Sequence, residues 1–421
     1  MVKTLHSIHK ALFLLNLNQL SISMALKFYP AKHSNCILRI AELGNAIVLA
    51  WHNRLRLDLD SSVILKKIPK NSGLILVANH SDENYIKIFI ELSRRSNRRF
   101  TYMINAEAFE EWHGIAGWFL QRLGSFSVER GVKDLEAIRY AGDIVKKGQD
   151  ALIMFPEGEI YYLNDLVQPF KTGAVHIGLQ ALIEAQAQRP GWAVYIVPIA
   201  IKYRYRKSII SILNKRIRKI ERHLSIRTQY LSFKEHLIRI MGNLLKNPNS
   251  LSRTDTASEQ LEQLKKAVTE VRTSFLSKIE AKYHRVPPDL TSHTIERAQK
   301  MIFFLREQLK RKKIFSIETR VQIKKDLSEL KQTIQMAGWQ PGYIEFDPTE
   351  ERLAETVMKL EREAFKKKRP TPLGDRMVYV RIGNPLDLSL SVEPYKKDPS
   401  SVSHQIAEEL RDKIQSLIEK M

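Results

Sequence analysis

The sequence predicts an α/β fold in which a mostly parallel sheet, flanked by helices, is split by a long helical insertion. Short apolar segments of strand length alternate with helical segments between residues 73 and 200, which is typical of βαβ units. The alternation stops near Lys202, and charged helical segments continue to about residue 366 before one further strand, 377–383, and a closing helix. The 421 residues, 43% of them hydrophobic, can supply two or three folding units and exclude a collagen-like, low-complexity or largely disordered chain.

The N-terminal segment, residues 1–56, contains an apolar stretch, 11–28, that does not have the pattern of a membrane span. Two asparagines and a glutamine interrupt it, whereas a span needs about 20 predominantly apolar residues. The stretch also lacks the clear small-residue cleavage site of a signal peptide. Residues 36–56 then show apolar side chains at helical spacing. We therefore expect a cytoplasmic protein, peripherally associated with membranes and without a transmembrane span.

The first part of the α/β domain is predicted over residues 57–205. Its strands are predicted at 55–60, 73–80, 100–104, 125–128, 150–155 and 192–200. Its helices are predicted at 83–97, 106–122, 133–147 and 172–188. A basic helical insertion fills residues 206–373, and residues 374–421 supply the closing strand and helix of the domain.

Polar residues that could take part in catalysis follow the first buried strand: Asn79-His80 and then Asp82-Glu83. Ligand sites of α/β folds lie at the carboxyl ends of strands, so an imidazole at this position is a candidate general base. A neighbouring carboxylate would fix the tautomer of His80 and raise its basicity. The alternative is that Asp82 or Glu83 only caps the next helix.

A second candidate segment extends from Gly124 through Phe126 to Arg130, and it contains the predicted strand 125–128. An arginine beside a glycine at a strand end suits bidentate recognition of a phosphate. The alternative is a solvated surface arginine.

Another strand ends in Phe155-Pro156-Glu157-Gly158, which holds an acid between two residues that constrain the backbone. Lys171 then opens the following helix and is a candidate anion contact. Turn formation and a solvated lysine are the corresponding alternatives.

In this order and spacing, the segments resemble the motifs of the glycerolipid acyltransferase family, whose best-known members are lysophosphatidic acid acyltransferases. The matching blocks are Asn79-His80, 124–130, 155–158 with Phe170-Lys171-x-Gly173, and Val197-Pro198. The strand 378–383 with its following Asn-Pro is similar to the closing strand of the family. The resemblance covers about residues 60–205 and 375–390.

The resemblance implies that His80 removes a proton from a glycerol hydroxyl, which attacks an acyl thioester directly at a membrane surface, as in phospholipid biosynthesis. It implies no acyl-enzyme, no metal and no cofactor other than acyl-CoA or acyl-ACP as co-substrate. It places Arg130, Glu157 and Gly158 in the acceptor site, where Arg130 would meet the phosphate of a lysophospholipid or glycerol phosphate. The other motif residues that it assigns to substrate binding are Asn79, Gly124, Phe126, Phe155, Pro156 and Lys171.

The sequence departs from the family pattern at three places. Tyr85 stands where the family has the acid that supports the histidine, and a tyrosine is neutral at physiological pH. Asp82 or Glu83 is expected to replace that acid, and a catalytically degenerate lipid- or membrane-binding protein is the alternative. Ser127 replaces a common phenylalanine, and Glu159 begins a tripeptide that replaces Thr-Arg-Ser, which removes a cation and adds an acid.

The charge of the chain, 68 lysines and arginines against 46 acids, is a formal +22 and suits an anionic membrane surface or a phosphate-bearing substrate. Residues 202–246 hold 13 of these cations and two acids, a net +11. Within them, 208–224 is a basic amphipathic helix that either lies on a membrane or packs on the rest of the insertion. No nucleic-acid signature is present, so no nucleic-acid partner is expected. The single cysteine, Cys36, excludes an intramolecular disulfide.

Overall fold

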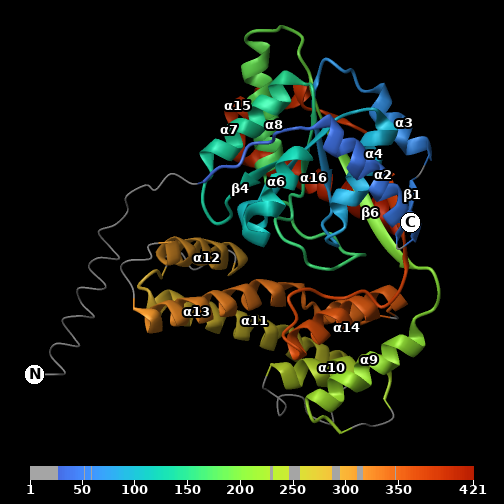
Figure 1. Cartoon of the computed structure of the whole chain (residues 1–421), viewed down its shortest axis with the longest axis vertical. Helices are drawn as coiled ribbons and strands as arrows, with labels where there is room; N and C mark the ends of the chain where they lie inside the picture. Colours follow the sequence, from blue (N-terminus) through green and yellow to red (C-terminus); the bar gives the residue numbers. More distant parts are fainter. Residues whose placement is uncertain are drawn as a thin grey trace, which may run out of the picture.

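The computed structural model describes most of the chain after its first 26 residues. The described ranges are 27–51, 53–57, 59–227, 231–245, 257–286, 294–310, 316–346 and 348–421, with only the backbone described over 46–62. Figure 1 shows an α/β body above a helical body. The apolar stretch 11–28 falls almost wholly outside these ranges, and within them no helix is both long and apolar enough to cross a membrane.

The sheet of the described residues has eight strands in the order β1-β7-β6-β2-β5-β3-β4, with β8 paired to β6. The strands are β1 (Asn53–Leu57), β2 (Gly73–Ala78), β3 (Phe100–Asn105), β4 (Ser125–Val128), β5 (Ala151–Met154), β6 (Val194–Tyr205), β7 (Arg376–Ile382) and β8 (Leu386–Asp387). All pairs are parallel except those of β6 with β7 and β8. This sheet confirms the predicted α/β class, and β7 brings the last part of the chain beside β6.

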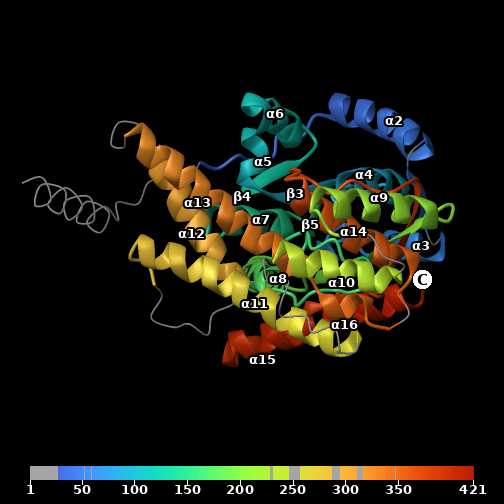
Figure 2. The ribbon, with the colours of Figure 1, turned by 90° about the horizontal axis from the view of Figure 1, so that it is seen from below.

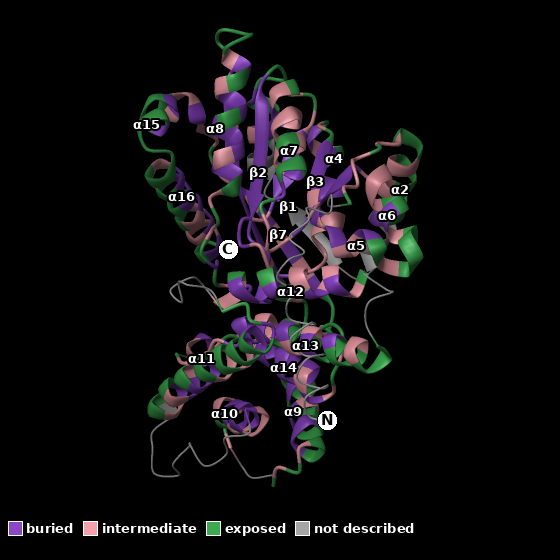
Figure 3. Ribbon diagram, turned by 90° about the vertical axis from the view of Figure 1, so that its left-hand side faces the viewer, coloured by how far each residue is buried: buried purple, intermediate pink, exposed green. Residues whose placement is uncertain are grey.

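Helices cover both faces of the sheet, so its central strands are apolar on both sides. On β2, Ile75 and Val77 pack with helices α7, α8 and α16, whereas Leu74 and Leu76 pack with α3, α4 and α5. Figure 3 shows β2 buried along its length. The helices of this body are α2 (Asn35–Trp51), α3 (Leu59–Lys67), α4 (Tyr85–Ser96), α5 (Ala106–Glu110), α6 (Ile115–Arg122), α7 (Leu135–Lys147), α8 (Gly173–Gln186), α15 (Val392–Lys397) and α16 (Pro399–Glu419).

The insertion forms a helical body with cores of its own. Its helices are α9 (Ile210–His223), α10 (Phe233–Leu244), α11 (Ala257–Lys282), α12 (Thr294–Lys310), α13 (Ile317–Gln335) and α14 (Glu350–Ala364). One core joins α9, α10, α11 and α14, and a second joins α11, α12 and α13. Figure 1 shows α12 as the helix of this body nearest to the sheet.

The amphipathic helix predicted at 208–224 corresponds to α9, and it packs within the insertion. Leu213, Ile217 and Ile220 are buried in the first core, although Ile212 stays 37% exposed. The apolar stripe is therefore used by the protein itself, because an inserted helical body needs its own core. The membrane alternative for this stripe was wrong. Of the basic side chains beside it, Lys215, Arg218, Lys219 and Arg222 are exposed, whereas Arg216 pairs with Glu361.

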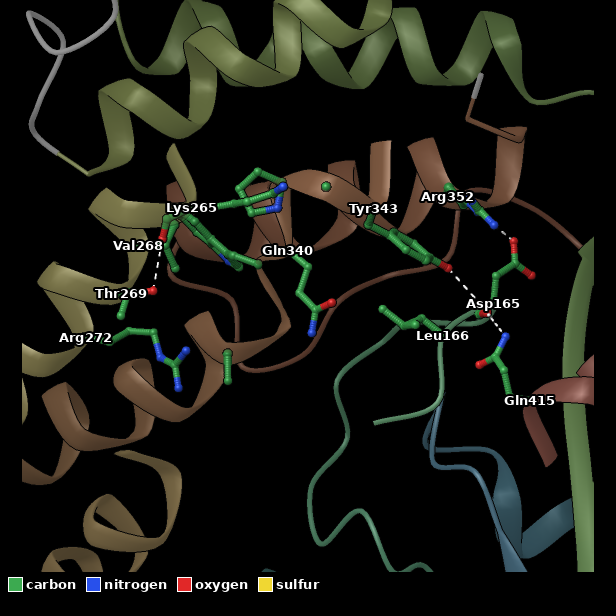
Figure 4. A pocket seen from close by; sticks show the side chains of 14 residues that line it. Asp165, Leu166, Lys265, Val268, Thr269, Arg272, Gln340, Tyr343, Arg352 and Gln415 are labelled. Atoms are coloured by element: carbon green, nitrogen blue, oxygen red, sulfur yellow. Dashed lines mark hydrogen bonds and ion pairs between the residues drawn. The ribbon is translucent and has the colours of Figure 1, made fainter. Parts of the chain in front are cut away.

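Polar contacts join the insertion to the α/β body on the side drawn in Figure 4. Asp165 accepts a hydrogen bond from Arg352 Nε at 2.9 Å, and its backbone N–H donates to Tyr343 Oη at 3.0 Å. Within the α/β body, Gln415 Nε2 of α16 donates to the carbonyl oxygen of Asp165 at 3.0 Å. A cavity of about 520 Å³ lies beside these contacts. A loop of the α/β domain, 155–172, thus forms one of the contacts between the two bodies, and it also carries the Phe155-Pro156-Glu157-Gly158 motif.

Three local features differ from the sequence prediction. Helix α10 was not predicted, and residues 59–67 form helix α3 after the short strand β1. The helix predicted at 106–122 is interrupted, because Trp112 and His113 adopt left-handed φ angles of 51° and 57°. This break separates α5 from α6 and turns Trp112 outward, where it is 72% exposed.

Candidate active site

The strand ends predicted to carry chemistry open into one cavity of about 760 Å³. β2 and β5 are neighbours in the sheet, so the residues that follow them meet. The His80 ring stacks on Phe155 with a centroid distance of 4.3 Å. The motif residues that line this cavity are His80, Arg130, Phe155, Pro156, Gly158, Lys171 and Gly173. The topology therefore brings these residues together as the sequence predicts.

His80 is a buried, neutral imidazole. Its side chain lies between Phe155 and Tyr85, whose ring centroid is 5.0 Å away in an edge-on arrangement. Within the described residues, neither Nδ1 nor Nε2 has a hydrogen-bond partner. Burial, with a smaller contribution from Arg130, lowers the pKa of His80 to about 3. The ring is consequently in the unprotonated form that can accept a proton.

The two carboxylates expected to support His80 are bound elsewhere, which corrects that prediction. Asp82 Oδ2 forms a buried ion pair with Arg376 Nη1 of β7 at 2.8 Å, and its Oδ1 accepts the Asn84 backbone N–H at 2.9 Å. Glu83 accepts a hydrogen bond from Tyr162 Oη at 2.6 Å and pairs with Arg369 at 3.0 Å. The loop after β2 thus directs both acids away from the imidazole.

Asn79 and Glu157 position His80 through its backbone. The Asn79 amide donates to the Ile201 carbonyl at 2.9 Å and accepts the Ile201 N–H at 2.8 Å. It therefore continues the ladder between β2 and β6 one residue beyond the end of β2 and is not available for substrate. Glu157 Oε1 accepts the His80 backbone N–H at 3.1 Å. This hydrogen bond makes Glu157 a structural partner of the loop, and burial raises the pKa of its carboxyl to about 8.

Gly124 and Phe126 do not line the cavity, contrary to their predicted role in substrate binding. Gly124 precedes β4 at the opposite end of the strand from Arg130, and a Cβ there would lie 2.8 Å from the Phe100 carbonyl oxygen. Phe126 is fully buried and packs with Phe28 and Tyr140. Both residues fix β4 in the sheet, which in turn places Arg130.

Arg130 is already paired with an acid of the same site. Its Nη1 lies 2.8 Å from Glu159 Oε2, and the other oxygen of Glu159 accepts a hydrogen bond from Gln299 Nε2 at 2.6 Å. Gln299 Oε1 in turn accepts from Lys171 Nζ at 3.2 Å. Burial lowers the pKa of Lys171, while Glu159 opposes this shift. We refer to Arg130, Glu159, Gln299 and Lys171 as the Arg130 chain.

Helix α12 of the insertion contributes residues that sequence reasoning missed. Gly131 has a φ of +83°, and a Cβ at that position would lie 2.4 Å from the Gln299 carbonyl oxygen. This close approach places Gln299 beside Arg130, and Arg306 of the same helix pairs with Glu129 at 2.6 Å. A smaller cavity of about 190 Å³ lies among these side chains and Lys331 of α13. No sequence motif in α12 predicts that this helix contributes to the site. The glycine after Arg130 was the one available signal, because glycine permits a close approach of another backbone.

Exposed apolar side chains surround one side of the cavity, on α6 and the turn before it. Trp112 is 72%, Ile115 57%, Trp118 45% and Phe119 48% exposed. Trp112 and Phe119 also line the cavity. Figure 2 shows α6 at the outer edge of the molecule, next to α5. We call these four residues the α6 patch.

The described residues contain no group of three or more histidine, cysteine, aspartate or glutamate side chains that could hold a metal ion. The cavity is lined by the His80 imidazole, by charged side chains of both signs, among them the paired Arg130, and by apolar residues.

Two comparisons with known proteins agree with this architecture. Residues 62–202 match the acyltransferase family model. The chain is also 30% identical, over 118 residues, to the 1-acyl-sn-glycerol-3-phosphate acyltransferase of Streptococcus pneumoniae (strain ATCC BAA-255 / R6). That alignment covers 28% of this chain and 41% of the relative.

The matched region contains the strands that carry His80, Arg130 and the Phe155-Pro156-Glu157-Gly158 motif, so its fold and site define an acyltransferase domain. Together the two comparisons support a glycerolipid acyltransferase assignment for residues 62–202. The helical insertion lies outside the matched residues.

Proposed function

We propose that this protein transfers an acyl group from an acyl thioester to a hydroxyl of a glycerol-based lipid at a membrane surface, with His80 as the general base. The observation that carries the proposal is the neutral His80 imidazole, with both ring nitrogens unengaged by the described residues, on the wall of a cavity of about 760 Å³. The family of the domain and the named relative support the same class of reaction.

His80 serves the proton transfers of this reaction, and the apolar cavity wall binds the acyl chain. His80 accepts the proton of the acceptor hydroxyl, and the hydroxyl oxygen forms a bond to the thioester carbonyl carbon. The carbon–sulfur bond then breaks, and the thiol leaves with the proton that His80 returns. The cavity wall is largely apolar, as an acyl chain requires, through residues such as Met103, Leu120 and Val128. The donor is acyl-CoA or acyl-ACP, and no further cofactor takes part.

The α6 patch supports the membrane-surface part of the proposal. Tryptophan and phenylalanine side chains favour the interface between lipid and water. Because Trp112 and Phe119 also line the cavity, the patch is continuous with the wall of the site, and a lipid bound at the patch lies next to the cavity. The net charge of +22 adds attraction to an anionic lipid surface.

A second candidate function, a catalytically degenerate acyltransferase-like protein that binds lipid or membranes, is favoured by one observation. Asp82 and Glu83 are bound to Arg376 and Arg369, so neither stabilises the imidazolium that catalysis would form at His80. Tyr85, which stands in place of the family acid, only packs against the ring.

Acyl transfer from a labelled acyl thioester to a panel of glycerol-based lipids tests the two functions. We expect transfer by the wild-type protein and a loss of at least about a hundredfold in His80→Ala. His404→Ala is the matched control, because His404 is exposed on α16. The folded protein could bind lipid vesicles but show no transfer with any pair of acyl thioester and glycerol-based lipid. This result would refute catalysis and establish the second function.

Vesicle sedimentation tests the membrane surface separately. Replacement of Trp112 and Trp118 by serine is expected to lower binding to vesicles of anionic phospholipid. Phe346→Ser is the control, because Phe346 is 79% exposed and lies outside the α6 patch. Equal losses in both variants would contradict the role of the patch.

A further inference from the structure

The cations around the candidate active site are already neutralised by the protein. Each arginine that lines the two cavities of the site is held by a carboxylate, and so is Lys331. The ion pairs are Arg130–Glu159 at 2.8 Å, Arg306–Glu129 at 2.6 Å, Arg369–Glu83 at 3.0 Å and Lys331–Glu107 at 2.9 Å. Lys171 is the remaining lining cation among the described residues, and its ammonium is engaged by the Gln299 amide. The chain as a whole is strongly basic, but its site is not.

Consecutive side chains of the Arg130 chain are joined by hydrogen bonds. Glu159 uses one carboxylate oxygen for Arg130 and the other for Gln299, so it cannot move away from the arginine without losing both contacts. Its side chain is 15% exposed and that of Arg130 is 31% exposed, which limits screening of the pair by water. Gln299 comes from the insertion and is held close by the contact of α12 with Gly131.

A phosphate bound at Arg130 would lie close to several carboxylates. It would displace Glu159 from Arg130 and then lie next to that carboxylate. The site also presents other carboxylates at its two cavities, namely Glu83, Glu107, Glu111 and Glu129. Like charges at short distance in a partly buried site repel strongly. A hydroxyl, by contrast, can donate to the carboxylate of Glu159 or accept from the cations already present.

Resting on the proposed function, we propose that the acceptor of this enzyme is an uncharged, hydroxyl-bearing lipid, such as a monoacylglycerol, and not a phosphate-bearing lysolipid. Glu159 is the residue that determines this specificity, because it takes the place of the phosphate on Arg130. Gln299 holds Glu159 in that position, which gives the insertion a part in acceptor selection.

The first test compares acceptors in the acyl-transfer assay. Wild-type protein should use monoacylglycerol with at least about tenfold higher kcat/KM than lysophosphatidic acid. Glu159→Gln keeps the side-chain volume but frees the charge of Arg130, so it should raise the relative use of lysophosphatidic acid by at least about tenfold. Glu409→Gln, which removes an exposed ion pair on α16, is the matched control and should leave the ratio unchanged.

The second test measures binding and does not depend on turnover. Calorimetric titration with glycerol 3-phosphate should show no binding to the wild-type protein and measurable binding to Glu159→Gln. The double variant Glu159→Gln/Arg130→Gln should lose that binding, and thermal unfolding should show that each variant is folded.

The two tests separate the proposals. Absence of transfer to any acceptor would refute the proposed function, while binding of glycerol 3-phosphate only after Glu159→Gln would still support the role of Glu159. Preference of the wild-type protein for lysophosphatidic acid, or binding of glycerol 3-phosphate by the wild-type protein that Arg130→Gln abolishes, would overturn the inference.

Discussion

The buried ion pair between Asp82 and Arg376 should hold the loop after β2 to strand β7. Both side chains are 8% exposed and their charged atoms are 2.8 Å apart. Arg376→Gln leaves the Asp82 carboxylate buried with hydrogen bonds from Asn84 alone, which should lower the free energy of unfolding by about 3–5 kcal/mol. Asp82→Asn should have a similar cost, because it leaves the arginine unpaired. The double variant buries two neutral amides and should lose less than the sum of the single variants.

Urea unfolding followed by tryptophan fluorescence measures these effects. We expect a coupling free energy of about 2–3 kcal/mol between the two sites. Arg411→Gln is the control, since Arg411 pairs with Asp412 at an exposed position and should change the free energy of unfolding by less than about 0.5 kcal/mol. Additivity of the two single variants within about 0.5 kcal/mol would refute the argument that the pair acts as a buried unit.

Two further predictions concern the loops of the site. Gly131→Ala should disturb the docking of α12, at a cost of about 1–3 kcal/mol, because of the positive φ and the 2.4 Å approach to Gln299. Hydrogen exchange of the α12 amides should report this, and Gly142→Ala, in open space on α7, is the control; unchanged protection of α12 would contradict the prediction. Glu157 binds its proton more tightly in the folded state, with a pKa of about 8 against an ordinary 4.5, so it contributes stability that is lost as the pH rises from about 5 to 8. Glu157→Gln should remove this decline in the melting temperature, and parallel pH profiles of the two proteins would show that the carboxyl does not titrate in this range.

The sequence was informative where chain order alone determines structure. Alternating apolar and amphipathic segments predicted the parallel sheet, and His80 after β2, Arg130 after β4 and Phe155 and Gly158 after β5 line one cavity, whereas Asn79, Asp82 and Glu157 do not. Side-chain direction within the loops was not predictable. Asp82 and Glu83 are adjacent to His80 in sequence, but their partners, Arg376 and Tyr162, are remote in the chain.

The contribution of the insertion to the site could not be predicted from the sequence either. Gln299 reaches Glu159 across 140 positions of the sequence, and no pattern in α12 distinguishes this glutamine from the others. The stripe of α9 was ambiguous for a related reason, because a helix that packs on its neighbours and one that lies on a membrane have the same apolar spacing. Only the presence of α10 and α14 beside α9 decides between them.

The departures from the family pattern have a common physical consequence. Tyr85 and Phe155 pack against the His80 ring and remove water from it, and no carboxylate among the described residues contacts the ring. Burial, with a smaller contribution from Arg130, therefore keeps the imidazole neutral, whereas a partner acid would have raised its basicity. At the acceptor side, Glu159 lowers the positive potential that Arg130 would otherwise add near the ring. Because a proton on His80 is disfavoured by any nearby cation, neutralising Arg130 partly offsets the loss of the acid, and a site of this kind suits an acceptor that brings no charge of its own.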